Sequence, residues 1–288
     1  MSKEYTVTYT AENTYENWVD DAFWQFLIIP EENETQDLVS IDFTNSIHAI
    51  NQFSINGYGF NTIRLHTRKK FKEISFKATF KIIKSFQDNT RTPSTPSMEE
   101  YSRLASTTDF KVDFEKYLRE TRLTSIPNSK TGLFEFIPSL SIYENLLALN
   151  NWTYIYLQYT AGVTDVNTTL DEIIDKKHGV CQDFTHLFCA ISKLNGIPAR
   201  YVSGYLNHES GFFGDSQMHA WAETYIPSLG WVGFDPTNNI VADHNHIKVS
   251  HGKDYDDCSP LKGVIYTQGS NKTSHSVSVV SQQKAAQQ

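Results

Sequence analysis

Three residues whose types can carry out nucleophilic catalysis follow one another along the chain: Cys181, His219 and Asp235. A cysteine thiolate can attack an acyl carbon, and a nearby imidazole can remove the thiol proton and later protonate the leaving group. A carboxylate can hold that imidazole in the required tautomer and stabilise its charged form. The three residue types therefore predict a nucleophile, a base and an orienting acid, provided that the fold brings them together.

Cys181 lies at the start of a predicted helix. A turn containing Gly179 precedes it, and the Asn-Gly-Ile-Pro segment at 195–198 ends the helix, because glycine is favoured beyond a helix end and proline cannot continue one. Unpaired amides and the positive end of the helix dipole lower a thiol pKa in the first turn. The alternative is a buried cysteine that only packs, since free cysteines are among the most buried residues. Between the Gly179 turn and the 195–198 segment, apolar residues recur at helical spacing, at Phe184, Leu187, Phe188, Ile191 and Leu194.

His219 and Asp235 are expected on the two strands of one β-hairpin. Residues 219–226 alternate in the manner of a half-buried strand. Residues 227–230 form a turn, and residues 231–236 are predicted to be the returning antiparallel strand. His219 therefore begins the first strand, and Asp235 lies near the end of the second.

The length of the hairpin loop decides whether this pair can meet. With a three-residue loop, Ile226 faces Gly230. Counting back along both strands, Trp221 then faces Asp235, and His219 lies two positions further on the same side. This diagonal separates Cβ atoms by about 7–8 Å, which an imidazole and a carboxylate can span. A two-residue loop would turn Asp235 to the other face, so the chemistry favours the three-residue loop or a bulge.

Several other residues could take part in the same chemistry. His178 and His186 are close to the nucleophile in sequence, but a turn residue and a residue on another side of the helix are more readily structural or solvent-facing. Cys189 lies deep in the apolar part of the helix, where packing is its expected role. A backbone amide at the helix start is the expected first oxyanion donor, and Trp152 and Tyr159 are candidates for the second.

Three linked segments resemble the bacterial branch of the transglutaminase-like superfamily. They are residues 179–184, 196–205 and the hairpin from 219 to 238, and the resemblance is strongest over 152–239. Members of this branch are commonly described as cysteine proteases, and the superfamily shares a papain-like core. By position, the resemblance implies the same catalytic roles as the residue types do, with the cysteine as nucleophile, the histidine as base and the aspartate as third member.

The resemblance also implies an α+β fold and a division of the chain. An N-terminal β domain, residues 1–88, would precede a papain-like, transglutaminase-like catalytic core in which the nucleophile helix packs on an antiparallel sheet. Residues 1–88 do alternate like strands, and residues 89–97, which include two prolines, suit a linker. The catalytic domain would span 98–288 and include C-terminal strands. Spacing typical of capping boxes predicts helix starts at Ser97, Ser141 and Thr169.

Composition narrows the class of protein and its partners. The chain has 288 residues, of which 39% are hydrophobic and 13% aromatic, enough for a sizeable core. A net charge of −8 argues against nucleic acid as a partner, because phosphate binding needs a basic face. The longest apolar run, residues 23–30, is far too short to cross a bilayer, so no membrane partner is expected.

The cysteines and the metal-binding patterns bear on the compartment and on cofactors. Cys181, Cys189 and Cys258 do not suggest a disulfide framework, and a catalytic thiol favours a reducing compartment. No N-terminal signal is visible, so we expect a cytoplasmic protein. The chain lacks His-Glu-x-x-His and paired Cys-x-x-Cys patterns, and its acidic cluster at 254–257 is not a calcium loop. We therefore expect neither a metal nor a cofactor.

Two classes of function are compatible with these residues. In an enzyme, attack of the thiolate on an amide carbonyl gives a thioester, which water resolves as hydrolysis or an amine resolves as transamidation. The family resemblance favours a protease or amidase acting on a peptide or protein substrate, with glutamine-lysine crosslinking as the alternative. The second class is a non-catalytic binding module on the same fold, against which the intact Cys, His and Asp argue. The sequence does not determine the oligomeric state.

Overall fold

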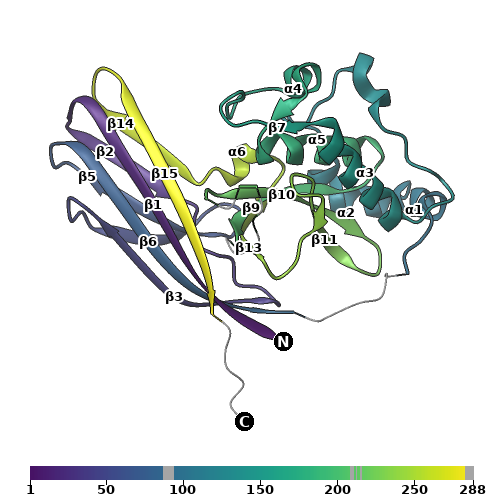
Figure 1. Cartoon of the computed structure of the whole chain (residues 1–288), viewed down its shortest axis with the longest axis horizontal. Coiled ribbons are helices and arrows are strands. Elements are labelled where there is room, and N and C mark those ends of the chain that lie inside the picture. Colours follow the sequence, from purple (N-terminus) through teal and green to yellow (C-terminus); the bar gives the residue numbers. More distant parts are fainter. Residues whose placement is uncertain (87–93, 208–210, 212, 215, 283–288) are drawn as a thin grey trace, which may run out of the picture.

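The chain forms an α+β fold in which long antiparallel strands occupy one end and a helix-covered sheet occupies the other (Figure 1). The computed structural model describes residues 1–288 except 87–93, 208–210, 212, 215 and 283–288. The predicted fold class is confirmed. Much of the predicted linker, residues 89–97, lies outside the described residues.

Two antiparallel sheets build the end that contains the N-terminal strands, in the orders β15-β1-β6-β3 and β14-β2-β5-β4. Their strands form because apolar and polar residues alternate: Tyr5, Val7 and Tyr9 of β1 are buried in the core between the sheets. The strands are β1 (Ser2–Val19), β2 (Asp21–Phe26), β3 (Gln36–Asn45), β4 (Asn51–Ile55), β5 (Asn61–Thr67), β6 (Phe71–Ser85), β14 (Leu261–Tyr266) and β15 (Asn271–Gln282).

The last two strands of the chain complete these sheets. β15 pairs with β1, from Glu4 opposite Gln282 to Tyr15 opposite Asn271, and β14 pairs with β2. The predicted domain of residues 98–288 includes both strands, whereas the structure joins them to the N-terminal sheets. Alternation of residues predicts a strand but carries no information on which distant strand it pairs with.

The other end contains a five-stranded antiparallel sheet in the order β12-β11-β10-β9-β13. In its central hairpin Ile226 pairs with Gly230 and Ala222 with Phe234. The three-residue loop and its register are therefore as predicted. Ser228 in the loop has a φ of 71°, a left-handed conformation that tight turns use. The strands are β9 (Ala199–Leu206), β10 (His219–Ile226), β11 (Gly230–Asp235), β12 (Ile240–Val241) and β13 (His246–Gly252).

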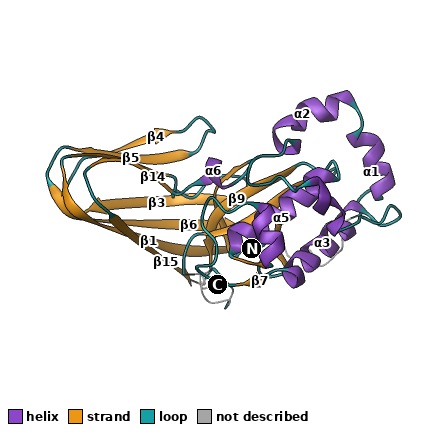
Figure 2. Cartoon of the chain, turned by 90° about the horizontal axis from the view of Figure 1, so that it is seen from above, coloured by secondary structure: helices purple, strands orange, loops and turns teal. Residues whose placement is uncertain are grey.

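Helices pack against this sheet, with α5 in direct contact with β9 and β10 (Figure 2). Ser97 and Ser141 cap α1 and α3 with complete capping boxes, as expected. Thr169 precedes α4, but its side chain makes no capping hydrogen bond to the backbone, contrary to the prediction. The elements are α1 (Met98–Ala105), α2 (Thr108–Leu118), the 3₁₀ helix η1 (Asn128–Leu133), α3 (Ile142–Tyr156), β7 (Gln158–Tyr159), α4 (Leu170–Lys176), β8 (His178–Gly179), α5 (Cys181–Leu194) and α6 (Tyr255–Cys258).

The predicted nucleophile helix is α5, and its packing fixes the position of its first residue. Leu187, Phe188 and Ile191 are buried in the core that α5 shares with α3, α4 and the sheet. The ring of Phe188 stacks on Phe234 of β11, with 5.5 Å between centroids. After α5 ends, Gly196 has a φ of +73°, which glycine adopts readily.

Strand β13 joins the two ends of the molecule. The side-chain amide of Gln36, from β3, donates to the carbonyl of Lys248 at 2.8 Å and accepts from its backbone N–H at 3.0 Å. The hydroxyl of Tyr205 donates to the carbonyl of Ile28 at 2.6 Å. Ile247 belongs to the core of the N-terminal sheets. The five-stranded sheet therefore packs against the N-terminal sheets through β13 and β9.

None of the helices formed by the described residues is both long enough and apolar enough to cross a membrane.

Candidate active site

Cys181 is the first residue of α5, and its side chain is partly exposed, whereas Cys189 and Cys258 are buried. The carboxylate of Asp183 in the same turn accepts the backbone N–H of Val180 at 2.8 Å. Asp183 thereby ties the residue before the nucleophile to the first turn of the helix. Because α5 begins at Cys181, the backbone amide of this residue lies outside the helical hydrogen-bond ladder and suits an oxyanion donor.

The approach of the chain to α5 depends on a glycine and on a buried carboxylate. A Cβ at Gly179 would lie 2.6 Å from the side chain of Asp183, so this position has no room for a larger residue. Burial raises the pKa of Asp183, and hydrogen bonds from the Thr164 hydroxyl and the Val180 amide oppose that rise. The Thr164 hydroxyl donates to Asp183 at 2.6 Å. These contacts hold the turn that presents Cys181.

His219 and Asp235 meet as the hairpin register predicts. The Nε2 atom of His219 lies 2.7 Å from Oδ2 of Asp235, and both side chains are fully buried. In the neutral ring this contact places the proton on Nε2, because a carboxylate can only accept. The Nδ1 atom then carries the lone pair. Asp235 therefore selects the tautomer that leaves Nδ1 able to accept a proton.

The other ring nitrogen of His219, Nδ1, is buried and has no hydrogen-bond partner among the described residues. Burial alone would lower the pKa of His219, but the charge and hydrogen bond of Asp235 outweigh it, with a smaller contribution from the nearby Cys181. The net effect is a pKa well above the ordinary range. Because Asp235 occupies Nε2, Nδ1 is the ring atom left for the thiol. Gly214 approaches this atom so closely that a Cβ there would lie 2.5 Å from it.

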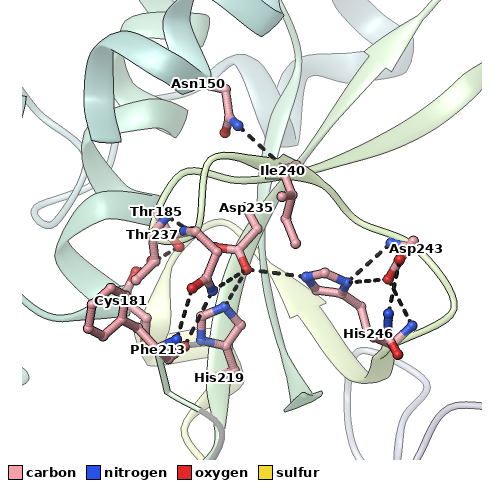
Figure 3. A network of polar contacts seen from close by, with 12 residues as sticks. Asn150, Cys181, Thr185, Phe213, His219, Asp235, Thr237, Ile240, Asp243 and His246 are labelled. Atoms are coloured by element: carbon pink, nitrogen blue, oxygen red, sulfur yellow. Dashed lines mark hydrogen bonds and ion pairs between the residues drawn. The ribbon is translucent and has the colours of Figure 1, made fainter. Parts of the chain in front are cut away.

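Asp235 is surrounded by N–H donors. Oδ1 accepts the backbone amides of Thr237 at 3.0 Å and Asn238 at 3.3 Å. Oδ2 accepts, besides His219, the side-chain amide of Asn238 at 2.8 Å and Nε2 of His246 at 3.2 Å (Figure 3). Burial would raise the pKa of Asp235, but the charge of His219 and these hydrogen bonds lower it well below the ordinary range. The carboxylate thus stays ionised although it is buried.

His246 is the member of this cluster that local sequence patterns do not mark. It begins β13, eleven positions after Asp235, and reaches it from across the sheet. A histidine at a strand start is the single available signal, and it is a weak one. His219, Asp235 and His246 offer possible metal-ligand atoms within 4.8 Å of one another. Their separations of 2.7 and 3.2 Å are hydrogen-bond lengths, and every donor found at Asp235 is an N–H group.

The other histidines near the nucleophile have different partners. Nδ1 of His178 lies 3.1 Å from the Thr160 hydroxyl. His186 is buried and accepts the backbone N–H of Tyr255 at 3.2 Å, and burial lowers its pKa to about 3. Cys189 is also buried, and burial raises its pKa to about 12. These contacts are those of residues with structural roles.

The two aromatic candidates for the second oxyanion donor lie in different surroundings. Trp152 stacks on Tyr156 within α3, with 4.5 Å between ring centroids. Tyr159 stacks on Phe213 at 4.9 Å, and the backbone N–H of Phe213 donates to Asn238 at 2.9 Å. Tyr159 is therefore connected to the Asp235 cluster, and Trp152 belongs to the helical core. The assignment of the second donor stays a prediction.

Part of the chain is similar to proteins of a known family. Residues 138–236 match the family model of the transglutaminase-like superfamily, a range that contains all three predicted catalytic residues. An uncharacterized protein of Mycobacterium tuberculosis is 29% identical over 284 residues, which cover 93% of this chain and 89% of that protein. A protein-glutamine gamma-glutamyltransferase of Pseudomonas aeruginosa is 31% identical over 77 residues, 25% of this chain and 12% of that protein.

A solved structure extends the likeness to the whole chain. It is that of a protein from Cytophaga hutchinsonii, provisionally described as a cysteine protease, with a TM-score of 0.78. The match covers 100% of this chain and 93% of that one, at 20% identity, and so shows a common fold. The chain therefore shares its fold with that protein, and its residues 138–236, which include the nucleophile helix and the hairpin, are similar to the transglutaminase-like superfamily.

Proposed function

We propose that this protein is a thiol-dependent acyl-transfer enzyme that hydrolyses peptide or amide bonds through Cys181, His219 and Asp235. One observation carries the proposal: His219 binds Asp235 through Nε2 at 2.7 Å, and its other nitrogen, which has no hydrogen-bond partner among the described residues, is left for the thiol of Cys181. A base oriented in this way, beside a partly exposed cysteine at a helix start, is the arrangement that nucleophilic catalysis requires.

The reaction follows from these positions. Nδ1 of His219 takes the thiol proton, and Sγ of Cys181 attacks the carbonyl carbon to form a tetrahedral intermediate. The imidazolium returns the proton to the leaving amine as the C–N bond breaks, which leaves a thioester on Cys181. Water, deprotonated by the same imidazole, attacks the thioester carbon, the C–S bond breaks, and the imidazolium returns the proton to Sγ, so that Cys181 is regenerated and the acid product is released. Asp235 stabilises the imidazolium in both halves of the cycle.

Transamidation is the second candidate, in which an amine replaces water at the thioester. The named relative from Pseudomonas aeruginosa is a protein-glutamine gamma-glutamyltransferase, and its similarity to this chain supports testing glutamine as acyl donor. The provisional description of the Cytophaga hutchinsonii protein as a cysteine protease supports hydrolysis. Both reactions share the thioester and differ only in the acceptor.

The proposal also includes a peptide or protein as substrate and the cytoplasm as compartment. A catalytic thiol must stay reduced, and all three cysteines are unpaired. Fractionation of cells that produce the protein at its natural level checks the compartment, and recovery outside the cytoplasm would contradict it.

The decisive experiment combines turnover with thiol labelling. Quenched fluorescent peptides and glutamine-containing peptides are incubated with the protein, with and without a fluorescent primary amine. We expect cleavage in water and loss of all products in Cys181→Ala; incorporation of the amine would instead establish transamidation. Iodoacetamide near pH 7 should label Cys181 selectively, because Cys189 and Cys258 are buried. Labelling at the rate of an ordinary thiol, with no product formed, would point to the binding module.

A further inference from the structure

A second histidine, His246, contacts the carboxylate that orients the base. Its Nε2 atom lies 3.2 Å from Oδ2 of Asp235, and its side chain is 1% exposed. Figure 3 shows it on the far side of Asp235 from His219, in one row of polar contacts. We propose that His246 is a positioning residue, which donates its Nε2–H to Asp235 and sets the orientation and charge of that carboxylate. The inference rests on the proposed function of the triad.

The direction of this hydrogen bond is fixed by the other ring nitrogen. The backbone N–H of Asp243 donates to Nδ1 of His246 at 3.1 Å, which requires Nδ1 to be an acceptor and places the proton of the neutral ring on Nε2. In the protonated ring Nδ1–H would face Oδ1 of Asp243, 3.3 Å away, and Nε2 would still carry a proton. His246 therefore donates to Asp235 in either state.

The donation matters because His219 shares Asp235 with other donors. Oδ2 accepts from His219, the Asn238 side chain and His246, while Oδ1 accepts two backbone amides. Each additional N–H neutralises part of the carboxylate charge and weakens its hold on the imidazolium proton. His246 consequently keeps His219 acidic enough to protonate a leaving amine. It also fixes which carboxylate oxygen faces His219.

His246 is held in turn by the N-terminal sheets. The ammonium of Lys84, near the end of β6, donates to the backbone carbonyl of His246. Two positions along β13, Lys248 makes the paired hydrogen bonds with Gln36 of β3. The N-terminal sheets therefore contribute to the site through the strand that carries His246. The titratable groups around His246 and its strand are Cys181, His219, Asp235, Asp243, His244, Lys84, Glu223 and Lys248.

Three variants of the full chain test the assignment. His246→Leu removes the donor, His246→Gln keeps an N–H at a similar distance from the backbone, and His244→Leu is the matched control. His244 pairs with Asp243 at 3.7 Å, and its ring stacks on Phe86. Two quantities are measured: kcat and KM with the substrate found above, and the rate of Cys181 alkylation by iodoacetamide against pH, which needs no substrate.

We expect His246→Leu to lower kcat by about tenfold or more at an unchanged KM, a part of the ~10²–10⁴-fold that a positioned proton-transfer group contributes. The alkylation rate, plotted against pH, should change on its alkaline limb where His219 loses its proton. In His246→Leu this limb should move up by about half a pH unit, because the unshared charge of Asp235 holds the His219 proton more strongly. His246→Gln should restore most of both, and His244→Leu should resemble the parent. A role in stability alone would lower the melting temperature without moving the limb.

The outcomes separate this inference from the proposed function. A shifted alkylation limb in His246→Leu together with no turnover by the parent would sustain the positioning role and reject hydrolysis. An unmoved limb, or the same shift in His244→Leu, would overturn the role of His246 whatever the enzyme does. If His246→Leu does not fold, His246→Asn, whose shorter side chain does not reach Oδ2, replaces it with the same expectations.

Discussion

Two carboxylates on the five-stranded sheet, Asp235 and Glu223, are both shielded from solvent but have different kinds of partner. Asp235 accepts N–H groups from two histidines, one asparagine side chain and two backbone amides. Glu223 binds two cations, the guanidinium of Arg200 at 2.6 Å and the ammonium of Lys248 at 2.8 Å. A histidine can gain or lose a proton near neutral pH, whereas arginine and lysine stay charged.

In the proposed mechanism, this difference separates the carboxylate that orients the base from one that belongs to an ion cluster. The guanidinium of Arg200 also stacks over the ring of Trp231, 4.0 Å from its centroid. With Lys248, the residues around Glu223 come from four strands, β9, β10, β11 and β13. Glu31 lies 3.6 Å from Lys248, so two cations face two carboxylates in this cluster. The comparison shows that burial and a shifted pKa do not identify a catalytic carboxylate by themselves. In the proposed mechanism, Asp235 is distinguished by its partner, a histidine whose other nitrogen is left for a nucleophile.

The largest effect is expected at the nucleophile. Cys181→Ala should abolish turnover, by at least about 10⁴-fold, because no other group can form the thioester. The free energy of unfolding should stay close to that of the parent, since this side chain is partly exposed. Cys189→Ala is the opposite case: its thiol is buried, so stability should fall while kcat per folded molecule is kept. Denaturant titration with parallel assays checks both, and unfolding of Cys181→Ala would mark a structural cysteine.

The second prediction concerns the carboxylate of the site. Asp235→Asn keeps the shape but favours the wrong tautomer of His219, so kcat should fall by up to about 10⁴-fold. A smaller loss is compatible with a cysteine nucleophile, which needs less help from its base. Asp175→Asn on the surface of α4 is the matched control. Activity of Asp235→Asn within about twofold of the parent would remove Asp235 from the mechanism.

The third prediction concerns the ion cluster. Glu223→Gln removes the carboxylate that Arg200 and Lys248 share, at side-chain exposures of 11% each, and should cost about 3–5 kcal/mol of unfolding free energy. The kcat of the folded fraction should stay near that of the parent. Glu172→Gln breaks an exposed pair with Lys176 and should cost less than about 1 kcal/mol. Equal losses of unfolding free energy in the two variants would mean that the Glu223 cluster contributes no more to stability than an exposed ion pair does.

The smallest expected effect is a difference in how the stability contributions of Glu223 and His219 depend on pH. Burial raises the pKa of Glu223, but Lys248 and Arg200 outweigh it and lower the pKa to about 2. Its stabilising contribution is therefore present above its unfolded pKa of about 4.3 and is lost as pH falls towards 2. The raised pKa of His219 works the other way: its contribution is present below about pH 6.5 and is lost as pH rises through the folded pKa.

Unfolding titrations from pH 2 to 10 measure both contributions. The stability difference between the parent and Glu223→Gln should shrink on the acid side, by about 1–3 kcal/mol. The difference between the parent and a His219→Ala variant should shrink on the alkaline side. A difference that does not vary with pH would mean that the corresponding group keeps one charge state throughout.

The parts of the site that were predictable depend on short-range patterns. The start of α5 at Cys181 follows from a turn, an apolar repeat and a terminating Asn-Gly, and the contact between His219 and Asp235 follows from one loop length. His246 was not predictable, because its contact depends on how β13 is aligned with β9 and on a bulge in that pairing. No local sequence pattern specifies such an alignment.

The same limit applies to the sheets. Alternation predicts β15 as a strand, but its partner β1 lies at the other end of the sequence, so the pairing depends on the packing of the whole core. Thr169 shows the limit at a helix end, where the residue type and spacing fit a capping box and the hydroxyl contacts Glu172 at 3.3 Å instead of the backbone. A sequence pattern indicates which contacts a segment can make, and the residues packed around that segment determine which of these contacts form.

The pairing of β1 with β15 has a consequence for how the protein is made. β1 leaves the ribosome before β15, which emerges after some 250 intervening residues, so this edge of β1 has no partner strand while those residues are made. The five-stranded sheet and its helices are synthesised before β15. Until β15 arrives, the open edge of β1 could pair with other nascent chains, and its alternating glutamate and threonine side chains would help to keep it apart from them.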